Sequence, residues 1–369
     1  MDKPRTYFFQ AEILSLALLS ERAESIAQKL QESEINWNGF VQLASSNLVL
    51  PALAYQLMKH DLLNHVPPGL ATYLNEIMIL NKERNKKVLE QANYVKGLLK
   101  KNGIEGVFMK GTGHMLDDLY DDVCERMVYD LDILVGEDEM VQAARILESE
   151  GYHTQKPFDP KAIESTMHYP ILLREDQVAG VEIHRMPSQY LYQHNFNTRI
   201  VINEKTESLG IRGFWVMNLR HRVIHNFLHS QLMHNGHFHA NVSLRDLYDL
   251  ALLGRTNDLL RLFRDYGHYQ NQSFSYLRLM HHVFGLEIPD DAALKKAGKS
   301  LIRRHERVLK MSARELRRHH RMFLVLQKYV VLPLRIIWNP LARNYVFSRL
   351  ADPGWYGRHW KAMKRQFRG

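Results

Sequence analysis

The feature that most constrains the fold is a short apolar stretch that carries two acidic residues, DLDILV at positions 130–135. Because side chains alternate across a strand, Asp130 and Asp132 would share one face while the apolar residues pack on the other. Two carboxylates held this close repel each other unless a cation lies between them. The stretch therefore predicts a buried strand that presents a divalent-metal site.

A second segment predicts a strand followed by a phosphate-binding turn. The largely apolar residues 104–109 run into Lys110, Gly111, Thr112 and Gly113, and a helix is expected from Thr112 to Tyr120. Glycines at such a turn let the backbone approach a phosphate, and the positive end of the helix dipole favours negative charge. With Lys110 at its mouth, the turn predicts contact with a polyphosphate.

A third segment, residues 180–185, alternates so that Glu182 and His184 would face one cleft. Glu182 is expected to be the third metal ligand or the base that activates an acceptor hydroxyl. His184 would either contact phosphate or assist proton transfer, or else hydrogen-bond to a neighbour at the edge of the cleft. Arg126, four residues before Asp130, would either reach a phosphate and brace the carboxylates or pair with an acid of its own loop.

The order of these elements resembles the nucleotidyltransferase superfamily, and specifically a divergent bacterial branch with Lys-Gly where other members have Gly-Ser or Gly-Gly. The resemblance extends from about Trp37 to about Leu252. It implies an α+β fold, with a small mixed-sheet core like that of polymerase β between helical regions. The residues that carry it are Lys110, Gly111, Tyr120, Arg126, Asp130, Asp132, Glu182 and His184.

The resemblance implies an enzyme that moves NMP from an NTP to a hydroxyl of a small molecule, a glycan or another polymer and releases pyrophosphate. Its cofactor would be Mg²⁺ or Mn²⁺. Asp130, Asp132 and Glu182 would bind the metal and carry catalysis. The nucleotide would contact Lys110, Gly111, Thr112, Gly113, Arg126 and His184.

Two other functions compete with nucleotidyl transfer. A glycosyltransferase also uses an Asp-x-Asp pair, to hold a metal against a nucleotide-sugar diphosphate. In that fold the apolar strand comes before the acid pair, whereas here it follows Asp132, so the order favours nucleotidyl transfer. The other alternative is a protein that keeps the same fold without turnover and binds a membrane or a partner.

Apolar periodicity predicts helices over residues 11–30, 39–58 and 70–99, and again after residue 216. These patterns divide the chain into four parts. We expect an N-terminal helical region (1–102), a nucleotidyltransferase core (103–187), a C-terminal helical region (188–300) and a basic tail that contains tryptophan (301–369).

Histidines gather in the second helical region. His225 and His229 have the i, i+4 spacing that can bind zinc, but Asn226 stands where a His-Glu-x-x-His protease has its glutamate. The alternative is that this helix and residues 244–249 pack behind the cleft. The family resemblance makes Arg245 and Asp246 candidates for an acceptor or nucleotide pocket.

Charge separates the tail from the rest of the chain. Residues 301–369 hold seventeen Lys and Arg against three acidic residues, a net charge of +14, while the whole chain has +9 and residues 1–300 therefore −5. Within residues 322–369, an apolar segment precedes Trp338, Trp355 and Trp360. This pattern suits an anionic membrane surface, although a helix docked on the core or a nucleic-acid partner would also account for it.

The compartment follows from cysteine and hydropathy. The single cysteine, Cys124, excludes an internal disulfide framework and favours a reducing cytoplasm. No uncharged apolar run reaches the roughly eighteen residues that a transmembrane helix needs. We therefore expect a cytoplasmic protein, either free or peripheral at the inner face of the membrane.

Overall fold

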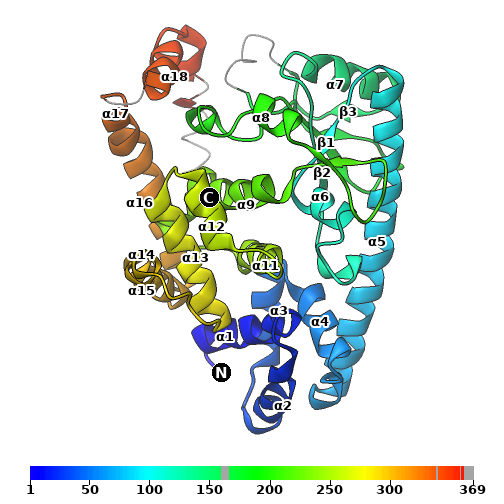
Figure 1. The fold of residues 1–369 in the computed structure, drawn as a ribbon, viewed down its shortest axis with the longest axis vertical. Helices are drawn as coiled ribbons and strands as arrows, with labels where there is room; N and C mark the ends of the chain where they lie inside the picture. Colours follow the sequence, from blue (N-terminus) through cyan, green and yellow to red (C-terminus); the bar gives the residue numbers. More distant parts are fainter. Residues whose placement is uncertain (159–165, 338–339, 358, 361–369) are drawn as a thin grey trace.

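The structure is a computed structural model that describes residues 1–158, 166–337, 340–357 and 359–360. A seven-stranded mixed sheet lies among many helices, so the predicted α+β fold is confirmed (Figure 1). Its strand order is β3-β4-β5-β2-β1-β7-β6. The strands are β1 (Val107–Phe108), β2 (Asp130–Leu134), β3 (His153–Thr154), β4 (Leu172–Leu173), β5 (Gly180–His184), β6 (Thr206–Glu207) and β7 (Trp215–Val216).

The two longest strands, β2 and β5, lie side by side at the centre of the sheet and run parallel. β1 pairs with β2 in the antiparallel direction, and its other edge meets β7. The apolar face of β2 is fully buried, because Leu131 and Ile133 have no exposed surface. The predicted strand at residues 130–135 is therefore present, ending at Leu134.

Five helices precede the sheet. The predicted single helices at 11–30 and 39–58 are each broken in two. The second break falls just before Pro51, which lies in the first turn of its helix. Proline is tolerated there because a backbone N–H at that position would have no intrahelical partner. The helices are α1 (Lys3–Leu14), α2 (Ala23–Glu32), α3 (Trp37–Ser46), α4 (Leu50–Lys59) and α5 (Pro68–Lys101).

Helix α5 spans most of the length of the molecule and covers the sheet on one side (Figure 1). Its buried residues Val88, Ala92, Val95 and Leu99 form an i, i+4 stripe in the hydrophobic core. It packs against α6 (Lys110–Leu116) and α7 (Met140–Ser149). The turn and helix that carry Lys110 are thus held between α5 and the sheet.

A second group of helices faces α6; α8 lies between β5 and β6, and the others follow β7. Helix α9 continues directly into a π-helical turn, Leu228–Met233. α1 packs against α13 and α15, which brings the start of the chain beside this group. The helices are α8 (Thr198–Asn203), α9 (Leu219–Phe227), α10 (Gly236–His239), α11 (Leu244–Leu253), α12 (Leu259–Tyr266), α13 (Gln270–Phe284), α14 (Ala292–Lys296) and α15 (Lys299–Leu309).

The tail forms a continuous helical segment at the edge of the molecule opposite α5 (Figure 1). It comprises α16 (Ala313–Leu326), a π-helical turn (Gln327–Val331) and α17 (Leu332–Arg335), and α18 (Pro340–Leu350) comes after it. Neither α16 nor the π-helical turn has a buried residue. Within the described ranges, no helix has the length and apolar character needed to cross a membrane. Trp338 and residues 361–369 lie outside the described residues.

Candidate active site

The acid pair and Glu182 lie on one face of the central strands. In the parallel pairing of β2 and β5, Asp132 stands opposite Glu182, and Asp130 stands opposite Gly180. Residues opposite each other in a sheet point to the same side, so three carboxylates from two neighbouring strands share one face. The structure thus brings together the three predicted acids.

Lys110 closes this face from the first position of α6, shortly after β1. Its ammonium nitrogen lies 2.5 Å from Oδ1 of Asp132. The backbone of Lys110 is left-handed, with φ 50°, a conformation that costs a residue with a Cβ of order 1–2 kcal/mol. Such strain persists where the surrounding structure enforces it, and it clusters at functional sites. Here it directs the lysine side chain toward the buried carboxylate.

His184 lies beside the same carboxylate from the end of β5. Its Nε2 is 2.8 Å from Oδ1 of Asp132 and 3.3 Å from Oε2 of Glu182. Burial lowers the pKa of His184, but the hydrogen bonds to both acids raise it overall. Its second nitrogen, Nδ1, is buried without a hydrogen-bond partner. The imidazole therefore acts as a hydrogen-bonded brace of Asp132 and Glu182 in this structure.

The three acids differ in how well their charge is compensated. Burial and the neighbouring Asp132 raise the pKa of Asp130 to about 6. Burial also opposes ionisation of Asp132, but Lys110 and His184 hold its pKa below the usual range. Burial works in the same direction on Glu182, and the hydrogen bond with His184 lowers its pKa. Asp132 and Glu182 are thus held ionised, and the carboxylate of Asp130 is the one that most needs an added cation.

The donor set fits a divalent metal. Asp132, Glu182 and His184 each offer a ligand atom, and these atoms lie within 4.8 Å of one another. Carboxylate oxygens suit Mg²⁺ and Mn²⁺, whereas an imidazole is a common ligand of softer transition metals. Asp130 on the same face supplies a further carboxylate oxygen. The site therefore has enough ligands for one cation.

Gly111, Thr112 and Gly113, predicted to form a turn, lie at the start of α6 and make close packing contacts there. A Cβ on Gly113 would lie 2.5 Å from the carbonyl oxygen of Phe108, and one on Gly111 would lie 2.9 Å from Val128. The Thr112 hydroxyl donates a hydrogen bond to the backbone carbonyl of Asp130, at 3.1 Å. The glycines thus allow α6 to pack tightly on β1. The expected helix at 112–120 begins earlier and ends at Leu116.

Arg126 does not contact the three acids. Its guanidinium pairs with Asp249 of α11 at 3.0 Å, and its Nε donates to the Tyr120 hydroxyl at 3.0 Å. Tyr120 in turn donates to Asp249 at 2.8 Å, which closes a buried network of three residues. The pairing of Arg126 with Asp249 was not predicted, because the two residues are more than a hundred positions apart along the chain.

The histidines of the second helical group lie beside Lys110. A small cavity of about 50 Å³ separates them from α6, and its lining includes His225, His229, Arg245 and Asp246. The rings of His225 and His229 are 5.8 Å apart, as their spacing on a helix predicts. Among the described residues, no third ligand joins them, because the one group of three or more metal-ligand side chains found there is Asp132, Glu182 and His184.

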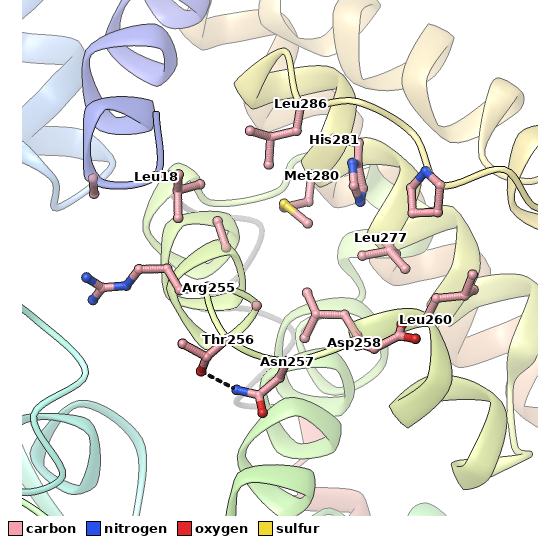
Figure 2. Close-up of a pocket in the computed structure, with 15 residues that line it drawn as sticks. Leu18, Arg255, Thr256, Asn257, Asp258, Leu260, Leu277, Met280, His281 and Leu286 are labelled. Carbon is pink, nitrogen blue, oxygen red and sulfur yellow. Dashed lines mark hydrogen bonds between the residues drawn. The ribbon is translucent and has the colours of Figure 1, made fainter. Parts of the chain in front are cut away.

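A larger cavity, of about 580 Å³, lies between the 3₁₀ turn after α1 and helices α11 to α13 (Figure 2). Its floor is apolar, with Leu18, Leu277 and Met280, and its rim carries Arg255 and Asn257. None of the three acids lines it. The acidic face of the sheet, with its compensating lysine and histidine, is therefore the candidate active site.

Comparisons with known proteins agree with this geometry. A family model described as an uncharacterised nucleotidyltransferase matches residues 33–285, more than half of the chain. The match includes both central strands, Lys110 and the histidine-bearing helices. Searches of curated proteins and of solved structures found no match. With residues 33–285 matched and a mixed sheet in place, the chain belongs to the family of uncharacterised nucleotidyltransferases.

Proposed function

We propose that this protein is a metal-dependent nucleotidyltransferase that moves NMP from an NTP to a hydroxyl acceptor and releases pyrophosphate. The observation that carries the proposal is the meeting of Asp132, Glu182 and Lys110 on the face of β2 and β5. The family match supports the general kind of reaction.

Asp130, Asp132 and Glu182 would hold the metal, which we propose to be Mg²⁺ or Mn²⁺. When bound, the cation would neutralise the phosphates and the charge that develops on the leaving oxygen. His184 would keep the carboxylates of Asp132 and Glu182 oriented through its two hydrogen bonds. Its Nδ1 has no partner, so it could also donate to a phosphate oxygen.

In the proposed step, the acceptor oxygen forms a bond to the α-phosphorus as the bond from that phosphorus to the β-phosphate oxygen breaks. Both electrons of the broken bond leave with pyrophosphate. The proton of the acceptor hydroxyl passes to Glu182, whose lowered pKa keeps it ionised and able to accept. Lys110 would bind the phosphate chain, since its ammonium already reaches the acidic face. Gly111, Thr112 and Gly113 would support the turn that presents Lys110, and Arg126 would hold that turn against α11.

Metal-dependent NTP binding tests this proposal. Calorimetry with each of the four nucleotides, in the presence of Mg²⁺, would compare the wild type with Asp130→Asn/Asp132→Asn. Asp176→Asn is the control, because that carboxylate is exposed and pairs locally with Arg174. We expect binding that needs the metal, disappears in the double variant and persists in the control. A folded wild type that binds no nucleotide would refute the proposal, and turnover of a nucleotide-sugar in its place would indicate a glycosyltransferase.

Binding of NTP without transfer to any acceptor would instead support the alternative of a protein that keeps the fold without turnover. Screening acceptors with radiolabelled NTP separates the two cases, because label appears in the product only when transfer occurs. Small hydroxyl compounds, glycans and nucleic acid are the classes to screen. The acceptor class remains open in the proposal.

A second role is proposed for the tail, which would bind an anionic membrane surface. Met322, Leu326, Val330 and Leu334 are exposed along the helical segment from α16 to α17. They fall on one side of a helix at intervals of three to four residues, and the exposed Arg314 and nearby arginines precede them. α16 packs on His239 of α10 through His319, His320 and Phe323, so the helix is anchored while Met322 and Leu326 stay exposed. This arrangement suits an interfacial helix with cations near the headgroups, and it would make the protein peripheral to the membrane.

A further inference from the structure

The small cavity beside Lys110 has an entirely polar lining. It lies between α6 of the core and the helices that follow the sheet, and its volume is about 50 Å³. Pockets that hold a whole drug-sized ligand measure roughly 300–1,000 Å³ and are mostly apolar. The cavity therefore suits a small polar group. It is lined by Lys110, His114, Arg126, His225, Asn226, His229, Arg245, Asp246 and Asp249.

The acceptor groups of this lining are already engaged. Asp249 accepts from Tyr120 and pairs with Arg126, and Asp246 is 3.4 Å from Nε of Arg245. The side-chain oxygen of Asn226 accepts a hydrogen bond from the hydroxyl of Tyr276 at 2.9 Å. The carboxylates and the amide oxygen therefore add little negative potential that would repel an anion.

Several nitrogen groups, by contrast, have no partner. His114 is 5% exposed, and its Nδ1 has no hydrogen-bond partner. The two terminal nitrogens of Arg245 make no hydrogen bond or ion pair with any described residue. Burial lowers the pKa of His114, so its ring is neutral and has one N–H to donate, whereas the ring of His225 already hydrogen-bonds to the backbone of Pro187. The cavity thus holds an unused donor on His114 and the two terminal nitrogens of Arg245, whose Nε faces Asp246.

We propose that this cavity binds the terminal phosphates of the NTP, with Arg245 and His114 as donors supplied from outside the acidic face. Lys110 links the two sites, because it lines the cavity and also lies 2.5 Å from Asp132. A phosphate chain that starts at the metal-binding acids can pass Lys110 and end in the cavity. Ionised phosphate oxygens accept hydrogen bonds but donate none, and a guanidinium group can donate two parallel hydrogen bonds to them. The inference rests on the proposed function and extends it to residues of the helical group.

Inorganic pyrophosphate is the probe that tests the cavity apart from the chemistry. Calorimetry without divalent metal would compare the wild type with Arg245→Gln and Arg245→Lys. Arg261→Gln serves as the control, since that side chain is 80% exposed on α12. We expect Arg245→Gln to weaken pyrophosphate binding by roughly ten- to a hundredfold, as is typical for a charged hydrogen bond. Arg245→Lys should recover part of the loss.

NMP binding with Mg²⁺ identifies which phosphates the cavity holds. We expect Arg245→Gln to leave the affinity for NMP within about twofold of the wild type, while it weakens the binding of pyrophosphate and NTP. Equal pyrophosphate affinity in Arg245→Gln and Arg261→Gln, both folded by circular dichroism, would overturn the inference. So would a loss of the same size for NMP.

Failure of this inference is distinguishable from failure of the proposed function. If NTP binds with metal and Asp130→Asn/Asp132→Asn abolishes it while Arg245→Gln has no effect, only the cavity assignment is wrong. If pyrophosphate binds in the wild type and depends on Arg245, but no NTP binds with metal, the cavity is an anion site and nucleotidyl transfer is wrong.

Discussion

Asp249→Asn should be among the most destabilising single substitutions of a polar residue in this protein. Its carboxylate pairs with the guanidinium of Arg126 at 3.0 Å, and the two side chains are only 4% and 8% exposed. Asparagine has almost the same volume, so the change removes charge without opening a cavity. Arginine stays protonated in proteins, so Arg126 would remain a buried and uncompensated cation. Breaking such a pair costs about 3–5 kcal/mol of unfolding free energy.

Removing the other partner, by Arg126→Met, should lower the unfolding free energy less at low pH than at high pH. Burial raises the pKa of Asp249 even with Arg126 present, so without that cation Asp249 takes up a proton more readily. For an acid whose folded-state pKa is raised, the folded state binds the proton more tightly, and stability falls as pH rises through that range. The loss of unfolding free energy in Arg126→Met, relative to the wild type, should therefore grow from pH 5 to pH 8. The loss in Asp249→Asn should change little over that range.

Urea unfolding followed by circular dichroism measures both effects. The control is Glu83→Gln, which removes an acid from an exposed pair with Lys86 and should change stability by at most about 0.5 kcal/mol. The double variant Arg126→Met/Asp249→Asn should lose less than the sum of the two single variants. A loss below about 1 kcal/mol for Asp249→Asn, with an unchanged slope of free energy against urea, would refute the reasoning.

Three further predictions test other parts of the molecule. Mn²⁺ or Mg²⁺ at a hundred times its Kd should stabilise the wild type by about 2.7 kcal/mol, and Asp132→Asn should abolish that gain in thermal unfolding; equal gains would contradict the metal site. Gly113→Ala should lose roughly 1–3 kcal/mol of unfolding free energy, because its Cβ would lie 2.5 Å from a backbone oxygen. Gly97→Ala, near the end of α5 and with nothing within 4 Å of the added Cβ, should gain about 0.5–1 kcal/mol in the same urea assay. Replacing Met322 and Leu326 with glutamine should reduce co-sedimentation with phosphatidylglycerol vesicles without changing the unfolding midpoint; unchanged sedimentation, or equal binding to phosphatidylcholine, would exclude the lipid surface.

The elements with a strict two-residue or strongly apolar pattern were predictable from the sequence. The alternation at 130–135 and 180–185 identified β2 and β5, and it placed Asp130, Asp132, Glu182 and His184 on the correct faces. The parallel pairing of these two strands was not predictable, because the register depends on contacts across some fifty residues. The two-residue strands at the sheet edges lack a readable period for the same reason.

Local rules also missed contacts of individual residues around the turn. Glycine next to lysine predicts a phosphate loop, but not that Gly111 and Gly113 also permit close packing or that Lys110 itself takes the left-handed conformation. For Arg126 the spacing offered a phosphate, the acid pair or an acid of its own loop, and the structure pairs it with Asp249 instead. In both cases the deciding contact comes from another segment, and one sequence does not encode such contacts in its spacing.

The position of these contacts would give the helical group a part in the proposed chemistry. Lys110 lies 2.5 Å from Asp132 on the acidic face and also lines the cavity, whose other side is formed by residues from α9 and α11. The buried network of Arg126, Tyr120 and Asp249 fixes the distance between the two sides. A nucleotide that spans both would be held by groups more than a hundred residues apart, all within the family match at 33–285. Helix α16, with its exposed apolar residues, lies outside that match. The matched region would therefore determine the reaction, while the tail would determine where this chain performs it.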